Sequence, residues 1–129
     1  MKILIVDDDA DFRKASQRVL RAYCPEFEIE EAAGLEGAQF TSLRAAAKGS
    51  PFDLIITDLN MPHANEGLDL IDLLRCKGVL AHTKIVLHCS EPSRAVAEQA
   101  LEFGATGVIY KSEQSLISRL EELKLIKKK

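Results

Sequence analysis

The sequence predicts a single α/β domain built on a parallel sheet, and two observations lead to this prediction. Short apolar runs rich in Ile, Leu and Val recur along the 129 residues, and they are nearly continuous. Such runs are typical of strands that are buried on both faces of a parallel sheet. Helical patterns separate the runs, so strand and helix alternate five times, which favours right-handed crossovers and helices on both faces. The chain is long enough for one core and too short for two, so we expect one domain over residues 1–129.

Five segments are predicted as strands. Four of them are almost wholly apolar and are expected to be buried on both faces of the sheet, whereas the second alternates apolar and acidic residues and suits an edge. In chain order the segments are ILIV at 3–6, FEIEEA at 27–32, DLIIT at 53–57, KIVLHC at 84–89 and GVIY at 107–110.

The segments between the strands carry the three-to-four-residue spacing of amphipathic helices. This spacing is clearest at residues 12–23, 68–74, 96–103 and 116–123. Gly49 and Gly104 are expected to end helices, because glycine is common just after a last helical residue. Pro92 and Ser112 are expected to begin helices.

Composition and charge exclude several classes of protein. With 47% hydrophobic and 29% charged residues, the chain is typical of a soluble globular protein. A formal net charge of -3 gives no electrostatic reason for direct nucleic-acid binding. No apolar stretch approaches the roughly 20 residues of a membrane span, and acids follow the N-terminal MKILIV too soon for a signal peptide, so we expect a cytoplasmic protein. The three cysteines and three histidines lack the spacing of a disulfide framework or a zinc site.

Charged residues stand at the ends of three predicted strands. The first strand runs directly into Asp7 and Asp8, the third into Asp58, and the fifth into Lys111. Ligands of open parallel sheets bind beyond the carboxyl ends of the strands. Carboxylates that are crowded together repel one another and need a cation or a proton. Three carboxylates and one ammonium in one crevice indicate a magnesium site suited to phosphate chemistry.

These residues resemble the receiver domains of the two-component response regulator family. The resemblance rests on the paired acids Asp7 and Asp8 after ILIV, on TDLNMP around Asp58, and on FGATGVIYK ending in Lys111. It covers nearly the whole chain. It implies a flavodoxin-like doubly wound (βα)5 fold with a five-stranded parallel sheet in the order 2-1-3-4-5. In that order the first and third strands are neighbours, so the three acids would converge, with Lys111 across from them.

The resemblance also implies a role for each residue. Asp58 would accept a phosphoryl group from a sensor histidine kinase or a histidine phosphotransfer protein, and Lys111 would contact the phosphate. Asp7 and Asp8 would bind Mg²⁺, with Asp58 and the backbone carbonyl of Asn60 as the remaining protein ligands. Phosphoryl transfer requires mainly alignment and charge neutralisation, which Mg²⁺ and a lysine supply. Such a domain is no enzyme beyond its own phosphorylation and dephosphorylation, and it signals through a downstream protein or by onward phosphotransfer, without membrane or nucleic-acid contact.

The chain departs from the family pattern at the positions that transmit the signal. The fourth strand of a receiver ends in Thr or Ser followed by a small residue, and an aromatic residue lies three before the lysine. Here Cys89 takes the hydroxyl position and Ser90 follows it, Val108 replaces the aromatic residue, and Ser112 replaces a common proline. Because a thiol is a weak donor, we expect Ser90 to supply the hydroxyl. Strand alternation would instead point Cys89 toward the phosphate, so both remain candidates.

Other interpretations of the acids remain. Asp7 could be the nucleophile of a haloacid-dehalogenase-like phosphatase, although Asp11 stands where Thr or Val is wanted and no later paired acids appear. The D-x-D-x-D stretch also resembles a calcium loop, but Phe12 stands in place of the required Gly and Arg18 in place of the Glu. Asp9 and Asp11 are expected only to favour the start of the first helix. We expect a stand-alone receiver, and a receiver fragment of a multidomain regulator is the alternative.

Overall fold

Five strands and five helices alternate in the part of the chain that the computed structural model describes, residues 1–61, 63–76, 78, 80–91, 93–111 and 115–127. The strands are β1 (Lys2–Val6), β2 (Glu28–Ala32), β3 (Leu54–Thr57), β4 (Lys84–Cys89) and β5 (Gly107–Tyr110). The helices are α1 (Ala10–Tyr23), α2 (Leu35–Ala47), α3 (Glu66–Cys76), α4 (Arg94–Glu102) and α5 (Leu116–Glu122). All five predicted strands are therefore present, within a residue of their predicted bounds.

The strands form one parallel sheet in the order β2-β1-β3-β4-β5, which confirms the predicted order. β2 lies at an edge, as its alternating pattern predicts. β1 and β3 pair along their length, with Ile3 opposite Leu54 and Val6 opposite Thr57. The residues that follow these two strands, Asp7 and Asp58, therefore emerge side by side at the carboxyl edge of the sheet.

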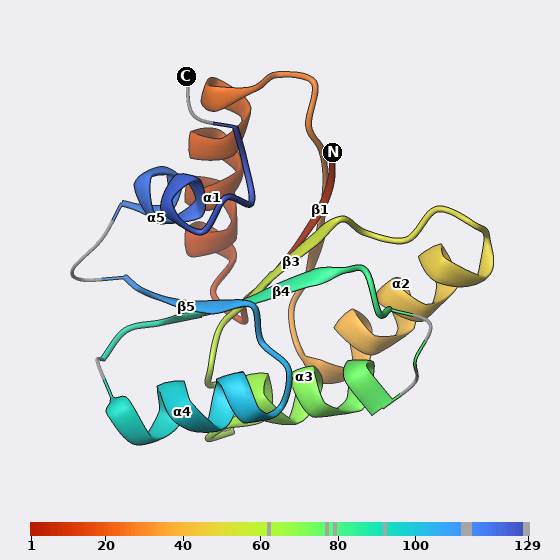
Figure 1. Cartoon of the computed structure of the whole chain (residues 1–129). Helices are drawn as coiled ribbons and strands as arrows, with labels where there is room; N and C mark the ends of the chain where they lie inside the picture. The colour runs from red at the N-terminus through yellow and green to blue at the C-terminus, as the bar shows by residue number, and fades with distance from the viewer. Residues whose placement is uncertain (62, 77, 79, 92, 112–114, 128–129) are drawn as a thin grey trace.

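Helices cover both faces of the sheet. α1 and α5 lie on one face, and α2, α3 and α4 lie on the other (Figure 1). Successive residues of β1 contribute alternately to the two apolar layers on either side of the sheet. Ile3 and Ile5 pack toward α1 and α5, and Leu4 and Val6 pack toward the other three helices. A strand that contributes to both layers has to be apolar at every position, which explains the continuous apolar runs of the sequence.

Two helices end at the predicted glycines. Gly49 follows α2 with a φ of 80°, and Gly104 follows α4 with a φ of 108°. The residue after each glycine donates its backbone N–H to a carbonyl in the last turn of the helix. Ala105, for example, donates to the carbonyl of Ala100 at 2.9 Å. α5 ends in the same way, but with Lys124 at a φ of 60° in place of glycine.

Serines cap the last two helices. The hydroxyl of Ser93 accepts from the backbone N–H of Val96, and that of Ser115 accepts from Ser118. The predicted start residues Pro92 and Ser112 lie outside the described residues. Among the helices that the structure describes, none has the length and apolar character needed to cross a membrane.

Candidate functional site

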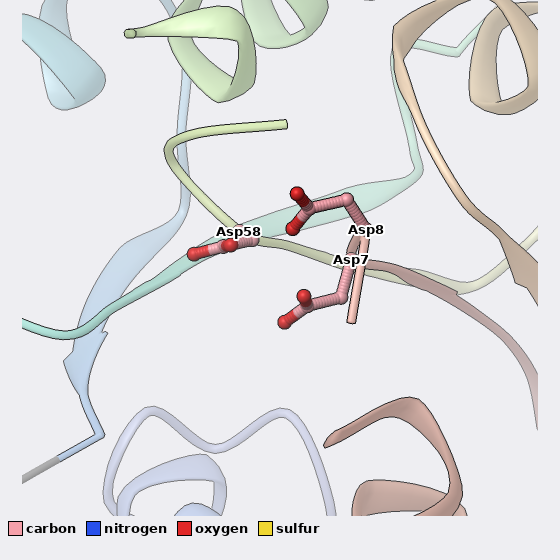
Figure 2. A group of neighbouring side chains, drawn as sticks. All are labelled: Asp7, Asp8 and Asp58. Atoms are coloured by element: carbon pink, nitrogen blue, oxygen red, sulfur yellow. The ribbon is translucent and has the colours of Figure 1, made fainter. Parts of the chain in front are cut away.

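Three acidic side chains meet at the carboxyl edge of the sheet. Asp7 and Asp8 follow β1 and Asp58 follows β3, and each offers a carboxylate oxygen that lies within 4.8 Å of the other two (Figure 2). Asp7 is buried with 3% of its surface exposed, Asp58 is partly buried, and Asp8 is exposed. The cluster is therefore fixed in the protein on one side and open to solvent on the other.

Backbone groups hold the two inner carboxylates in place. The Oδ1 atom of Asp7 accepts the backbone N–H of Asp9 at 2.9 Å, and Oδ1 of Asp58 accepts the N–H of Leu59 at 2.9 Å. Arg13 donates from its guanidinium to the backbone oxygen of Asp7 at 2.6 Å. These contacts orient the carboxylates before any ligand binds.

Lys111 lies across from the acids, at the end of β5. Its ammonium is 3.0 Å from Oδ2 of Asp7 and 3.2 Å from Oδ1 of Asp58, and its side chain is mostly buried. The same ammonium lies 3.9 Å from the centroid of the Phe12 ring, a cation–π contact. The ring of Phe12 packs in turn on His88, with 5.3 Å between the ring centroids. Lys111 is thus positioned by two carboxylates and one aromatic face.

The site is short of positive charge. Burial raises the pKa of the Asp58 carboxyl, Lys111 opposes this shift, and the carboxylate of Asp7 adds to it. His88 contributes no charge at neutral pH, because burial and the Lys111 ammonium lower its pKa to about 4. Among the described residues, the Lys111 ammonium pairs with Asp7 and Asp58, and the guanidinium of Arg13 pairs with Glu31 outside the cluster. The three carboxylates are therefore matched by one ammonium. An oxygen-rich, anionic cluster with an open side suits a hard divalent cation.

Asn60 lies in the loop between β3 and α3. Its side-chain oxygen accepts the backbone N–H of Asn65 at 2.9 Å, and Asn65 has a φ of 65°. Asparagine tolerates this left-handed conformation better than most residues. The side chain of Asn60 thus holds the loop in its conformation. The family resemblance implies that its backbone carbonyl, rather than its side chain, would bind the metal.

The predicted signalling positions lie beside the cluster. Cys89 is the last residue of β4 and is 2% exposed, whereas Ser90 follows the strand and is exposed. Burial and the nearby Asp58 carboxylate raise the pKa of the Cys89 thiol, and Lys111 opposes this shift. Val108 is buried in the same apolar layer as Cys89, under α4. The thiol is therefore within the electrostatic field of the site, while the side chain of Ser90 reaches solvent.

The first helix accounts for the remaining acids. Oδ1 of Asp9 accepts the backbone N–H groups of Asp11 and Phe12, so Asp9 caps α1, and Asp11 lies in its first turn. These are the roles that we predict for both residues. Because α1 begins at Ala10, residues 10–18 are helical and the calcium-loop alternative is wrong.

Three residues of the site, Phe12, Arg13 and His88, are not predicted by the sequence as members of it. For Phe12 the sequence predicts only a place in the helical spacing. The signal that could have found Arg13 and Phe12 is their position in the first turns of a helix that starts three residues after Asp7. No signal in the sequence indicates that His88 packs on Phe12.

A doubly wound parallel sheet with an acidic cluster and a lysine at its carboxyl edge defines a receiver-type signalling domain. The chain belongs to the response regulator receiver domain family, whose model matches residues 3–121. This membership favours the receiver interpretation over the phosphatase alternative, in which Asp7 would be the nucleophile.

Curated relatives and solved structures agree with the family. The chain is 34% identical over 111 residues to chemotaxis protein CheY-3 of Vibrio cholerae, which covers 86% of this chain and 80% of the relative. It is also 34% identical over 111 residues to the glycerol metabolism activator of Pseudomonas putida, but spans about half, 47%, of that protein.

Among solved structures, the chemotaxis response regulator CheY4 of Vibrio cholerae superimposes with a TM-score of 0.78 at 27% identity, covering 95% of this chain and 97% of that one. A response regulator from Burkholderia pseudomallei, solved with a phosphorylated aspartic acid, a calcium ion and citrate, gives a TM-score of 0.75 at 25% identity. That match covers 95% of this chain and 65% of the other.

Proposed function

We propose that this chain is a phosphoacceptor receiver, in which Asp58 takes a phosphoryl group from the phosphohistidine of a sensor histidine kinase or a histidine phosphotransfer protein. The observation that carries the proposal is the position of the Asp58 carboxylate, 3.2 Å from the Lys111 ammonium and within 4.8 Å of the two acids after β1. In the transfer, a carboxylate oxygen of Asp58 bonds to phosphorus, the P–N bond breaks, and the imidazole of the donor leaves. Lys111 is placed to balance the charge of the transferred oxygens.

We further propose that the acidic cluster binds Mg²⁺. Asp7, Asp8 and Asp58 would be carboxylate ligands, and the backbone carbonyl of Asn60 would be a further oxygen ligand. Mg²⁺ prefers oxygen ligands and keeps several waters, which suits a cluster that is open at the exposed Asp8. Bound there, the ion would neutralise charge on the transferring phosphoryl group. The phosphorylated aspartic acid and calcium ion in the Burkholderia pseudomallei regulator support this proposal.

Labelling with a small phosphodonor tests the phosphoacceptor role. Wild type incubated with acetyl phosphate and Mg²⁺ should gain the mass of one phosphoryl group, and Asp58→Asn should gain none. Peptide mapping should place the group on Asp58. Equal labelling of both proteins, or a phosphoryl group on Asp7, would contradict the proposal, and the second result would support a phosphatase-like nucleophile.

Thermal unfolding tests the metal site. Millimolar Mg²⁺ should raise the melting temperature of wild type, because a ligand that binds only the native state stabilises it. Asp8→Ala should abolish this response without harming the fold, since Asp8 is exposed. Asp11→Ala is the matched control, because Asp11 is also an exposed acid near the start of α1 but lies outside the cluster. A response that survives Asp8→Ala would overturn the ligand assignment.

The response to phosphorylation is proposed to run through the end of β4. Burial of Cys89, and the effect of the Asp58 carboxylate in raising the pKa of its thiol, favour the thiol over the exposed Ser90 as the group that meets the phosphate. With Val108 in place of a ring, the change should stay within residues 88–95. Chemical-shift changes should therefore shrink in Cys89→Ala and persist in Ser90→Ala, and the opposite pattern would restore Ser90 to the role.

The wider function follows from the same proposal. Residues 1–129 would act as one receiver domain in the cytoplasm, with self-phosphorylation and autodephosphorylation as its only reactions. Its output would be contact with a downstream protein or onward transfer of the phosphate. The cognate kinase could be identified by phosphotransfer profiling against the histidine kinases of the organism, where one donor should label Asp58 far faster than the others.

A further inference from the structure

The outer surface of α2 carries an exposed aromatic residue. Phe40 is 64% exposed, the largest fraction among the large hydrophobic side chains that the structure describes as exposed. It lines a shallow hollow of about 400 Å³ with four neighbours on the same helix, Glu36, Gln39, Leu43 and Arg44. An aromatic ring gains much from burial, so Phe40 offers a large apolar area to a partner that covers it.

The charges beside Phe40 are ordered along the helix. Glu36, Phe40 and Arg44 are spaced four residues apart, which places them on one of the ridges through which helices pack. The Arg44 guanidinium lies 5.3 Å from the centroid of the Phe40 ring. Within the described ranges, neither Glu36 nor Arg44 forms an ion pair. The ridge therefore presents an acid, an aromatic ring and a base, in that order.

We propose that this ridge docks on the α2 helix of a second copy of the chain, antiparallel to it, with a two-fold axis at Phe40. In such an isologous contact residue i meets residue j and j meets i. Glu36 of each copy would then face Arg44 of the other, about 6 Å to either side of the axis at 1.5 Å rise per residue. The two phenyl rings would meet at the centre. An acid and a base placed symmetrically about an aromatic residue make the ridge complementary to itself, which identifies a second copy as the occupant.

The contact is separate from the proposed phosphoacceptor site. It uses none of the cluster acids and not Lys111, and α2 packs over the β1 and β2 side of the sheet beside α3 (Figure 1). The inference therefore does not depend on phosphorylation. A stable interface buries roughly 1,000 Å² or more, and a contact through one helix ridge is small beside that, so we expect a weak dimer that forms at high protein concentration.

Sedimentation equilibrium from micromolar to millimolar protein tests the dimer. The weight-average mass of wild type should rise from 14.3 kDa toward twice that value as the concentration increases. Phe40→Asp, Glu36→Arg and Arg44→Glu should each weaken association by about tenfold or more, because each removes the ring contact or opposes like charges across the axis. All three positions are exposed, so the variants should keep the wild-type circular dichroism spectrum.

Mixing the two charge variants is the decisive step. Glu36→Arg brings two bases to its ridge and Arg44→Glu brings two acids, so an equimolar mixture should associate about as well as wild type while each variant alone stays monomeric. Leu101→Asp is the matched control, since Leu101 is 54% exposed on α4 and should not affect association. Three results would overturn the proposal: wild type that is monomeric at millimolar concentration, a mixture that fails to associate, or a dimer that Leu101→Asp abolishes.

Discussion

Replacing Gly67 with Ala should strain the loop that carries Asp58. Gly67 lies in the first turn of α3, where its backbone N–H donates to the carbonyl of Leu59 at 2.7 Å. A Cβ atom at this position would overlap the carbonyl oxygen of Asp58 and lie 2.9 Å from the Cα atom of Leu59. Both neighbours are backbone, so no side-chain rotation can relieve the overlap. Either the loop or the start of α3 has to move.

The size of the effect follows from two opposing contributions. Overpacking costs about 1–3 kcal/mol when backbone must shift. Ala in place of Gly in a helix returns about 0.5–1 kcal/mol. The free energy of unfolding should therefore fall by about 1 kcal/mol. For 129 residues the entropy of unfolding is about 0.27 kcal/mol/K, so the melting temperature should drop by about 4 °C.

Calorimetry and phosphorylation kinetics check this prediction together. Phosphorylation of Gly67→Ala by acetyl phosphate should also slow, since the displaced Leu59 N–H orients the Asp58 carboxylate. Gly37→Ala in α2 is the matched control, because the nearest atom to its added Cβ is that of Ala32 at 3.9 Å. That variant should gain about 0.5 kcal/mol. If Gly67→Ala melts at or above the wild-type temperature, the close approach of α3 to the loop is refuted.

Three further predictions follow from single residues. His88 should stay neutral down to a pH of about 4 in an NMR titration. Because the unfolded state takes up this proton near pH 6.5, acidification from 6.5 to 4 should cost about 3 kcal/mol of stability, and His88→Gln should reduce that loss. Asp58→Asn should raise the melting temperature of metal-free protein at neutral pH, since the raised pKa of Asp58 means that the folded state disfavours its charge. A melting temperature at or below that of wild type would contradict this. Lys124→Gly should stabilise the protein by about 1 kcal/mol, because Lys124 has a φ of 60°, and Lys127→Gly, the control, should not.

The strands could be predicted from the sequence because burial on both faces leaves a direct trace in composition. Each residue of β1 from Ile3 to Val6 contacts one core layer or the other, so the run has no polar position. The order of the strands in the sheet is not visible in the composition of the strands. Which strands are neighbours depends on contacts between residues some fifty positions apart, such as Val6 with Thr57. The order 2-1-3-4-5 was therefore available only through the family resemblance.

The charged residues of the site could be predicted for a related reason. A residue that follows a strand stays at the carboxyl edge whatever the helices do, so Asp7, Asp58 and Lys111 were found from the ends of apolar runs. Phe12 and Arg13 reach the site from α1, and their contacts depend on the rotation of that helix over the sheet. The sequence carries the spacing of a helix but not its rotation, and these two residues were missed accordingly.

The choice between Cys89 and Ser90 depends on where the β4 ladder ends. Period-two alternation holds only while the backbone stays in the sheet. The backbone oxygen of Cys89 still accepts the N–H of Lys111 at 2.8 Å, so the ladder includes Cys89 and stops before Ser90. Alternation therefore extends through Cys89, which packs in the same layer as Ile85 and Leu87. Ser90, one residue after the strand end, therefore does not take the position at which other receivers carry the Thr or Ser hydroxyl. If the proposed switch runs through a thiol, a weaker donor than a hydroxyl, its pull on the loop before α4 should be correspondingly weak.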